Sequence, residues 1–167
     1  MINQVRDFTL PAAYSLLPEA MNSPNASALI LSIGLQESQF IARRQGGNGP
    51  ARGFFQFEKA GIRGVATHAS TRDLLQTALR DLCYSGSVGQ TAKLHAIIEH
   101  NDVLACVFAR LLLWTLPGRL PARGEQEEAW RQYLDAWRPG KPRPTTWAAH
   151  FTEAWACIDA FNPKENP

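Results

Sequence analysis

Glu37 is the residue whose type and position best suit acid–base chemistry. It continues a stripe formed by Ala26, Ile30 and Ile33, whose spacing places all four residues on one helix face. A carboxylate that ends an apolar stripe is partly removed from water, which raises its pKa and keeps it protonated, as a general acid requires. Gly34, one turn before Glu37, has no side chain to crowd the Glu37 carboxylate. The alternative is that the helix frays early and Glu37 points into water.

Two short motifs surround this position. Residues 37–40 read Glu-Ser-Gln-Phe, and residues 53–57 read Gly-Phe-Phe-Gln-Phe after a glycine-rich loop, so that Gln56 lies nineteen positions after Glu37. This pattern resembles the lysozyme-like superfamily, in particular the lytic transglycosylases and their phage-encoded relatives. In that family Glu-Ser-x-Phe ends a buried helix and Gly-x-x-Gln follows. Residues 109–115 and 137–142 also look like phage and prophage proteins of this fold, so the resemblance spans most of the chain.

The resemblance implies a role for each residue of the two motifs. Glu37 would be the catalytic acid, and Ser38 would support the geometry around it. Gln56 would line the cleft and help to hold an N-acetylated sugar. Gly53 would let the backbone approach the glycan closely, where a side chain would block it.

The family also carries a Tyr-Asn-x-Gly element on a later helix, with its tyrosine near the acid. The nearest stretch here, residues 133–140, has no such asparagine. Tyr133 or Trp137 is the candidate for the tyrosine's role. The competing interpretation is that Trp130, Tyr133 and Trp137 share one helix face and simply belong to the core.

The loop residues also suit glycan binding. Phe55 is expected to offer a flat apolar face to a sugar ring, whereas Phe54 and Phe57 are expected in the core. Four arginines are suited to attract the acidic groups of the cell wall, unless they are merely solvated: Arg43, Arg44, Arg52 and Arg63.

One acid is enough for the reaction that the resemblance implies. Hydrolytic glycosidases generally use two carboxylates, and no second acid stands near Glu37 in a recognisable motif. Four others are candidates by type alone: Glu58, Asp73, Asp102 and Asp135. Lytic transglycosylases cleave the β-1,4 bond between N-acetylmuramic acid and N-acetylglucosamine with a single acid and no cofactor. The alternatives are a hydrolytic lysozyme (an endolysin) with an unrecognised second carboxylate, and a non-catalytic virion or tail protein.

Helices must position these groups. Helical patterns are predicted over residues 11–21, from 24 to the loop at 46–50, over 54–68 as two short helices or a kinked one, and over 71–84, 90–99, 103–116, 124–138 and 144–160. No period-two run is long enough for a confident strand. We therefore expect a mainly α single domain over residues 1–167, with at most a small irregular β element within 42–57, and the resemblance implies that its fold is lysozyme-like.

The composition disfavours nucleic-acid binding, metal binding and a membrane-spanning segment. The chain has 167 residues, 45% of them hydrophobic, and a net charge of +2 without a basic stripe, which disfavours nucleic acid as a partner. Cys83, Cys106 and Cys157 form no Cys-x-x-Cys pair, and the four histidines show no metal-ligand spacing, so we expect buried free thiols and no metal. The apolar runs 26–35 and 103–116 fall short of the ~20 residues that span a bilayer, and Arg110 interrupts the second.

The expected location follows from the N-terminus, which lacks the pattern of a secretory signal. We expect a monomer made in the bacterial cytoplasm, without stable membrane insertion, that binds peptidoglycan glycan strands. It would reach the periplasmic wall after release by a membrane-permeabilising partner such as a holin, or as a virion component.

Overall fold

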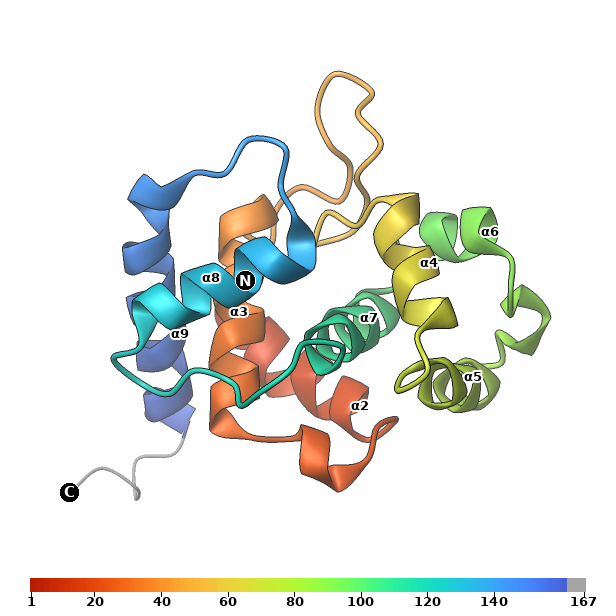
Figure 1. Ribbon diagram of the computed structural model, residues 1–167, viewed down its shortest axis with the longest axis horizontal. Helices are drawn as coiled ribbons and strands as arrows, with labels where there is room; N and C mark the ends of the chain where they lie inside the picture. The colour runs from red at the N-terminus through yellow and green to blue at the C-terminus, as the bar shows by residue number, and fades with distance from the viewer. Residues whose placement is uncertain (162–167) are drawn as a thin grey trace.

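Helices carry almost all of the regular structure in residues 1–161, the part of the chain that this computed structural model describes (Figure 1). The predicted mainly α fold class is confirmed. In chain order the elements are α1 Ile2–Gln4, a π-helical turn Val5–Thr9, α2 Leu10–Tyr14, a 3-10 turn Glu19–Met21, α3 Pro24–Ser38, α4 Lys59–Thr67, α5 Arg72–Asp81, a 3-10 turn Ser85–Ser87, α6 Thr91–Ile97, α7 Asp102–Trp114, α8 Gln126–Trp137 and α9 Pro144–Phe161.

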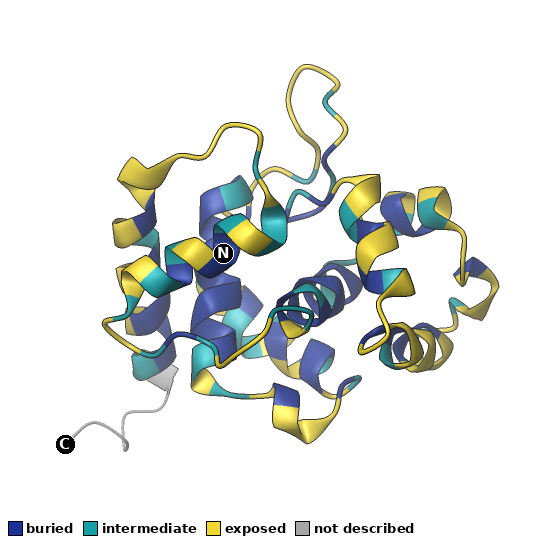
Figure 2. Cartoon of the chain, in the orientation of Figure 1, coloured by how far each residue is buried: buried dark blue, intermediate teal, exposed yellow. Residues whose placement is uncertain are grey.

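The central element is α3, as its apolar sequence predicts. Ser23 caps its N-terminus by accepting a hydrogen bond from the amide of Ala26 at 3.1 Å, and Pro24 occupies the first turn. Every residue from Ala26 to Gln36 is buried. Helix α9 packs along α3, α7 runs through the middle of the fold, and α4 contacts α5, α6 and α7 (Figures 1 and 2). Other helices therefore cover α3 up to its last turn, which carries Glu37.

Two predicted helix ends and two predicted helix starts are wrong. Helix α2 ends at Tyr14 and not at residue 21, and α3 ends at Ser38, well before the loop at 46–50, because Gln39 and Phe40 take left-handed conformations. Helical structure begins at Ile2 instead of Pro11, because a π-helical turn leads directly into α2 and places Pro11 in the first turn of that helix, where its missing N–H costs little. Residues 54–57 do not belong to α4. Gly53 and Gln56 have positive φ values of 71° and 48°, which a right-handed helix cannot accommodate, so α4 starts only after Glu58.

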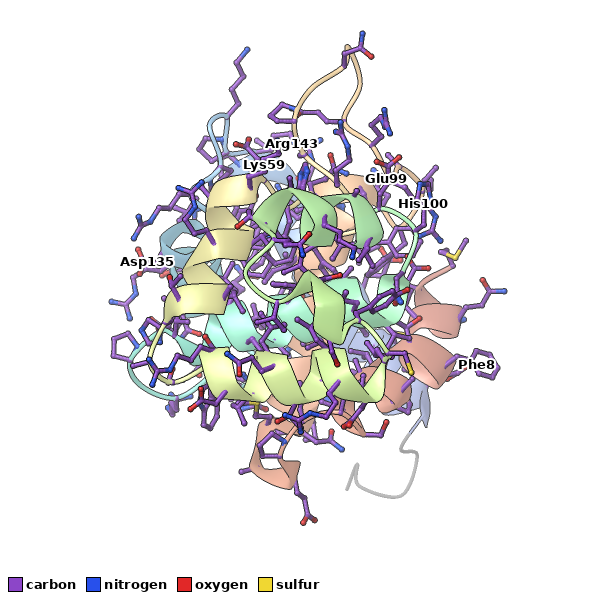
Figure 3. The ribbon with its side chains drawn as sticks, turned by 90° about the vertical axis from the view of Figure 1, so that its right-hand side faces the viewer. Phe8, Lys59, Glu99, His100, Asp135 and Arg143 are labelled. Carbon is purple, nitrogen blue, oxygen red and sulfur yellow. The ribbon has the colours of Figure 1, made fainter. Side chains whose placement is uncertain are left out.

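The predicted irregular β element is confirmed in its minimal form. Isolated antiparallel bridges join Arg44 to Arg52 and Arg52 to Phe57 within the loop that projects at the top of Figure 1. Glu99 anchors this loop by pairing with Arg44 at 2.8 Å and with Arg52 at 3.0 Å. Figure 3 shows Glu99 beside His100 at the edge of the molecule. These arginines therefore hold the loop in place and are not free cations.

The cysteines only partly match the expectation of buried thiols. Cys106 and Cys157 are buried, but Cys83 is exposed, because it follows the end of α5 in a left-handed conformation and turns out of the helix face. Among the residues described, no helix has the length and apolar character needed to cross a membrane.

Candidate active site

A tight reversal of the chain ends α3 just after Glu37. Gln39 and Phe40 both take left-handed conformations, with φ values of 53° and 55°, which turn the chain back over the helix. The ring of Phe40 then lies against Gly34, where an added Cβ would stand only 2.1 Å from the Phe40 ring. The glycine thus makes room for Phe40, and this packing fixes the helix end that carries Glu37.

Glu37 itself is half-buried and hydrogen-bonded. The hydroxyl of Tyr133, on α8, donates to Glu37 Oε1 at 2.6 Å. Burial raises the pKa of Glu37 above its ordinary value of 4.5, and the opposing effects of the Tyr133 hydrogen bond and the Arg143 charge are smaller. The alternative in which α3 frays and the carboxylate points into water is excluded, since α3 extends through Ser38.

Tyr133 is positioned by the aromatic side chains around it. Its ring is 2% exposed and stacks on Trp147 of α9, with centroids 5.1 Å apart. Burial and the adjacent Glu37 carboxylate raise the pKa of its hydroxyl, so the hydroxyl keeps its proton and acts as a donor. Tyr133 is therefore both a core residue, as one sequence interpretation held, and the partner of the candidate acid, as the other required.

Hydrogen bonds bring the second motif to the same place. Ser38 Oγ donates to the carbonyl of Phe54 at 2.6 Å and accepts from the amide of Phe40 at 3.1 Å. Trp137 Nε1, one turn after Tyr133 on α8, donates to the carbonyl of Phe55 at 2.9 Å. The segment 53–57 is thus held between the end of α3 and the end of α8. Ser38 and Trp137 act on this segment as positioning residues.

Gln56 stands half-exposed at the end of this loop. Its Nε2 donates to the carbonyl of Gly53 at 2.9 Å, so the amide nitrogen stabilises the turn and the amide oxygen is the group left to meet a ligand. Its role in holding a sugar stays a prediction.

The expectation for Gly53 needs a different physical reason. A Cβ on Gly53 would stand 2.6 Å from the carbonyl oxygen of Ile98, and its φ of 71° already favours glycine. The close approach is therefore to the protein's own backbone at the end of α6, and not to a glycan strand.

The prediction that Phe55 offers its ring to a sugar is wrong. The residue is 1% exposed, and its ring meets Phe40 edge-on with centroids 6.2 Å apart. The turn formed by the segment 53–57 directs all three of its phenylalanines inward. The expected core positions of Phe54 and Phe57 are confirmed, each at 3% exposure.

Two polar residues of the site were missed by the sequence analysis. Gln36 is buried beside Glu37, and its Oε1 accepts from Thr146 and His150 of α9, each at 2.9 Å. Its Nε2 donates to the carbonyl of Arg143 at 2.9 Å, while the Arg143 guanidinium donates to the carbonyl of Gln36. These bonds place the Arg143 charge near Glu37. A long polar side chain directly after the apolar stretch of α3, immediately before Glu37, was the available signal.

Asp102 is occupied elsewhere. It forms a two-pronged ion pair with Arg43, one prong being Arg43 Nη2 to Asp102 Oδ2 at 2.7 Å. Within residues 1–161, the side chains that perturb the pKa of Glu37 are Tyr133 and Arg143, neither of which is a carboxylate.

Comparison with known proteins adds no relative to this picture. No protein-family model, curated protein or solved structure matches the chain. The chemical interpretation of the site accordingly depends on its own geometry.

Replacing Tyr133 with phenylalanine is expected to raise the pKa of Glu37 further. The Tyr133 hydroxyl stabilises the ionised carboxylate, so its removal leaves the burial effect less opposed. A ¹³C NMR titration of the Glu37 carboxyl carbon measures this directly. Tyr14→Phe is the matched control, because it removes a buried hydroxyl bonded to Ser27 at 3.0 Å elsewhere in the core. An unchanged or lower Glu37 pKa in the Tyr133 variant would contradict the assignment.

Proposed function

We propose that this protein cleaves peptidoglycan glycan strands at the β-1,4 bond between N-acetylmuramic acid and N-acetylglucosamine, by lytic transglycosylation. The observation that carries the proposal is the half-buried Glu37 carboxyl, whose pKa burial raises and to which Tyr133 donates at 2.6 Å. The order and spacing of the two motifs, which resemble those of lytic transglycosylases, add support. The packing of segment 53–57 against Ser38 and Trp137 beside this acid is compatible with it.

In the proposed reaction Glu37 acts twice. It first gives its proton to the bridging oxygen as the glycosidic bond breaks, and the acetamido group of the substrate stabilises the positive charge that develops at C1. The resulting carboxylate then takes the proton from the muramyl 6-hydroxyl, whose oxygen bonds to C1 and closes a 1,6-anhydro ring. Such a group needs a pKa near the working pH, and burial moves the pKa of Glu37 in that direction.

A transglycosylase is favoured over a hydrolase by the surroundings of Glu37. A retaining or inverting hydrolase would place a second carboxylate roughly 5–10 Å from the first. Arg143, the charged residue that perturbs Glu37 in the described part of the chain, is a cation.

The products decide between these reactions. We expect purified protein incubated with peptidoglycan to release muropeptides that end in 1,6-anhydro-N-acetylmuramic acid, as identified by mass spectrometry. Reducing termini would instead show hydrolysis. Absence of any soluble product, together with a failure to clear permeabilised Gram-negative cells, would favour the third possibility, a non-catalytic virion or tail component.

A further inference from the structure

Arg110 is a buried cation that has no carboxylate partner among residues 1–161. It lies on α7 at 2% exposure, and its Nε donates to the carbonyl of Met21 at 2.8 Å. Its Nη1 is buried and has no hydrogen-bond partner among residues 1–161, and no carboxylate in that range forms an ion pair with it. Burying an unpaired guanidinium is costly, so such a group usually meets an anion.

Arg110 also lines a cavity of about 270 Å³. It lies between the start of α3, the end of α7 and the segment that follows α7. Its lining combines polar groups and cations with an apolar wall, and it contains no acidic side chain: Ala20, Ser23, Asn25, Arg110, Leu113, Trp114, Leu116, Gly118, Arg119 and Leu120. The volume is close to the lower end, about 300 Å³, of sites that take small molecules.

The N-terminus of α3 also suits an anion. Of its first donors, Pro24 has no N–H, Ala26 is capped by Ser23 Oγ, and Ser27 donates to the Ser23 carbonyl at 3.0 Å. The amide of Asn25 remains at the positive end of a fifteen-residue helix, and Asn25 lines the cavity. Amides at such a helix end are natural donors to anions.

Two further side chains complete the arrangement. The Arg110 guanidinium stands 5.0 Å over the ring of Trp114, which is 40% exposed and offers an apolar surface at the cavity. Arg119 supplies a second cation at the rim, where it also pairs with Glu125 at 2.6 Å. The lining of this cavity thus combines positively charged groups with apolar surface.

We propose that this cavity is a binding site for a small oxyanion-bearing molecule, a carboxylate or a phosphate. Arg110 and the amide of Asn25 hold the oxyanion, and Trp114 with the neighbouring leucines accommodates an apolar body if the ligand has one. The site lies at the opposite end of α3 from Glu37, roughly 18 Å away along the helix at ~1.5 Å per residue. It is therefore separate from the proposed active site and does not depend on the proposed function.

Titration with two probes tests the proposal. Inorganic phosphate and sodium benzoate are added to the protein at constant ionic strength made up with sodium chloride, and ¹H–¹⁵N NMR follows the Asn25 amide and the Arg110 Nε–H signal. We expect saturable shifts at both signals and a saturable rise in Tm, since a ligand that binds only the folded state stabilises it. Tighter binding of benzoate identifies a carboxylate on an apolar body, and tighter binding of phosphate identifies a phosphate ligand.

Variants make the test specific. Arg110→Met is expected to abolish the saturable Tm rise, and Arg119→Gln, on the exposed rim, is expected to weaken binding several-fold. Arg63→Gln, which removes an exposed charge from α4, is expected to bind as wild type does. If Arg110→Met does not fold, the wild-type titration and the Arg119→Gln titration still show whether the cavity binds the oxyanion. Shifts that are absent, that do not saturate, or that persist unchanged in the Arg110 and Arg119 variants would overturn the proposal.

Discussion

Glu37→Gln is expected to lower the rate of glycan-strand cleavage by about 10²–10⁴-fold, the usual contribution of a general acid. Glutamine matches glutamate in size, and its oxygen can still accept from the Tyr133 hydroxyl, but it has no acidic proton for the bridging oxygen. The rate is measured as release of muropeptides and as clearing of permeabilised Gram-negative cells. Equal activity in wild type and variant would show that Glu37 is not the acid.

The matched control is Glu127→Gln, which neutralises an exposed glutamate in the first turn of α8. It is expected to retain wild-type activity, because Glu127 lies outside the proposed site.

Loss of activity in Glu37→Gln is not expected to come from unfolding. Because the pKa of Glu37 is raised in the folded state, the folded protein binds more protons than the unfolded chain between pH 4.5 and the folded-state pKa of Glu37. The contribution of Glu37 to the free energy of unfolding therefore falls as the pH rises through its folded-state pKa. Glutamine carries no charge and avoids this loss, so the variant is expected to be at least as stable as wild type at neutral pH. Thermal unfolding followed by circular dichroism checks this.

Gly53→Ala is expected to lower the free energy of unfolding by about 2–5 kcal/mol. A left-handed conformation costs a residue with a Cβ ~1–2 kcal/mol, and forcing an atom into a packed site typically costs a further ~1–3 kcal/mol. At this position the Cβ would stand 2.6 Å from the backbone oxygen of Ile98, which cannot rotate away as a side chain could. Urea unfolding measures the change.

Gly64→Ala separates this effect from a general response to alanine. Gly64 lies in α4, and an added Cβ there meets nothing within 4 Å. Its replacement is expected to stabilise the protein by about 0.5–1 kcal/mol, since alanine loses less conformational freedom than glycine in a helix. If Gly53→Ala proved as stable as wild type, the tight contact between segment 53–57 and the end of α6 would be ruled out.

Local sequence patterns were sufficient to predict the features that depend on a single helix. The apolar run after Pro24, with Ser23 before it, predicts a buried helix, and the stripe ending at Glu37 predicts a partly desolvated carboxylate. Both depend on side chains three or four residues apart, whose relation is set by helix geometry alone. The same helix geometry applies in α9, where Trp147, Phe151 and Trp155 recur at steps of four and are all buried.

Local patterns failed where the chain turns. Phe55 lies in a segment without periodicity, so nothing in its neighbours indicates which way its ring points. The left-handed residues Gly53 and Gln56 set that direction, and the hydrogen bonds from Ser38 and Trp137 hold it. The start of α4 was misplaced for the same reason.

By itself, the amino-acid sequence determined that the chain is mainly helical, that α3 is buried and that a carboxylate lies at its end, but not where every helix begins. Only the tertiary structure decided which groups surround that carboxylate. Tyr133 is 96 positions from Glu37 and Arg143 is 107 positions from Gln36, so these contacts exist only because α9 packs along α3 and α8 packs against α9 and α7. Helix formation is governed by neighbours within a few residues, whereas the pairing of distant side chains depends on how whole helix surfaces fit together.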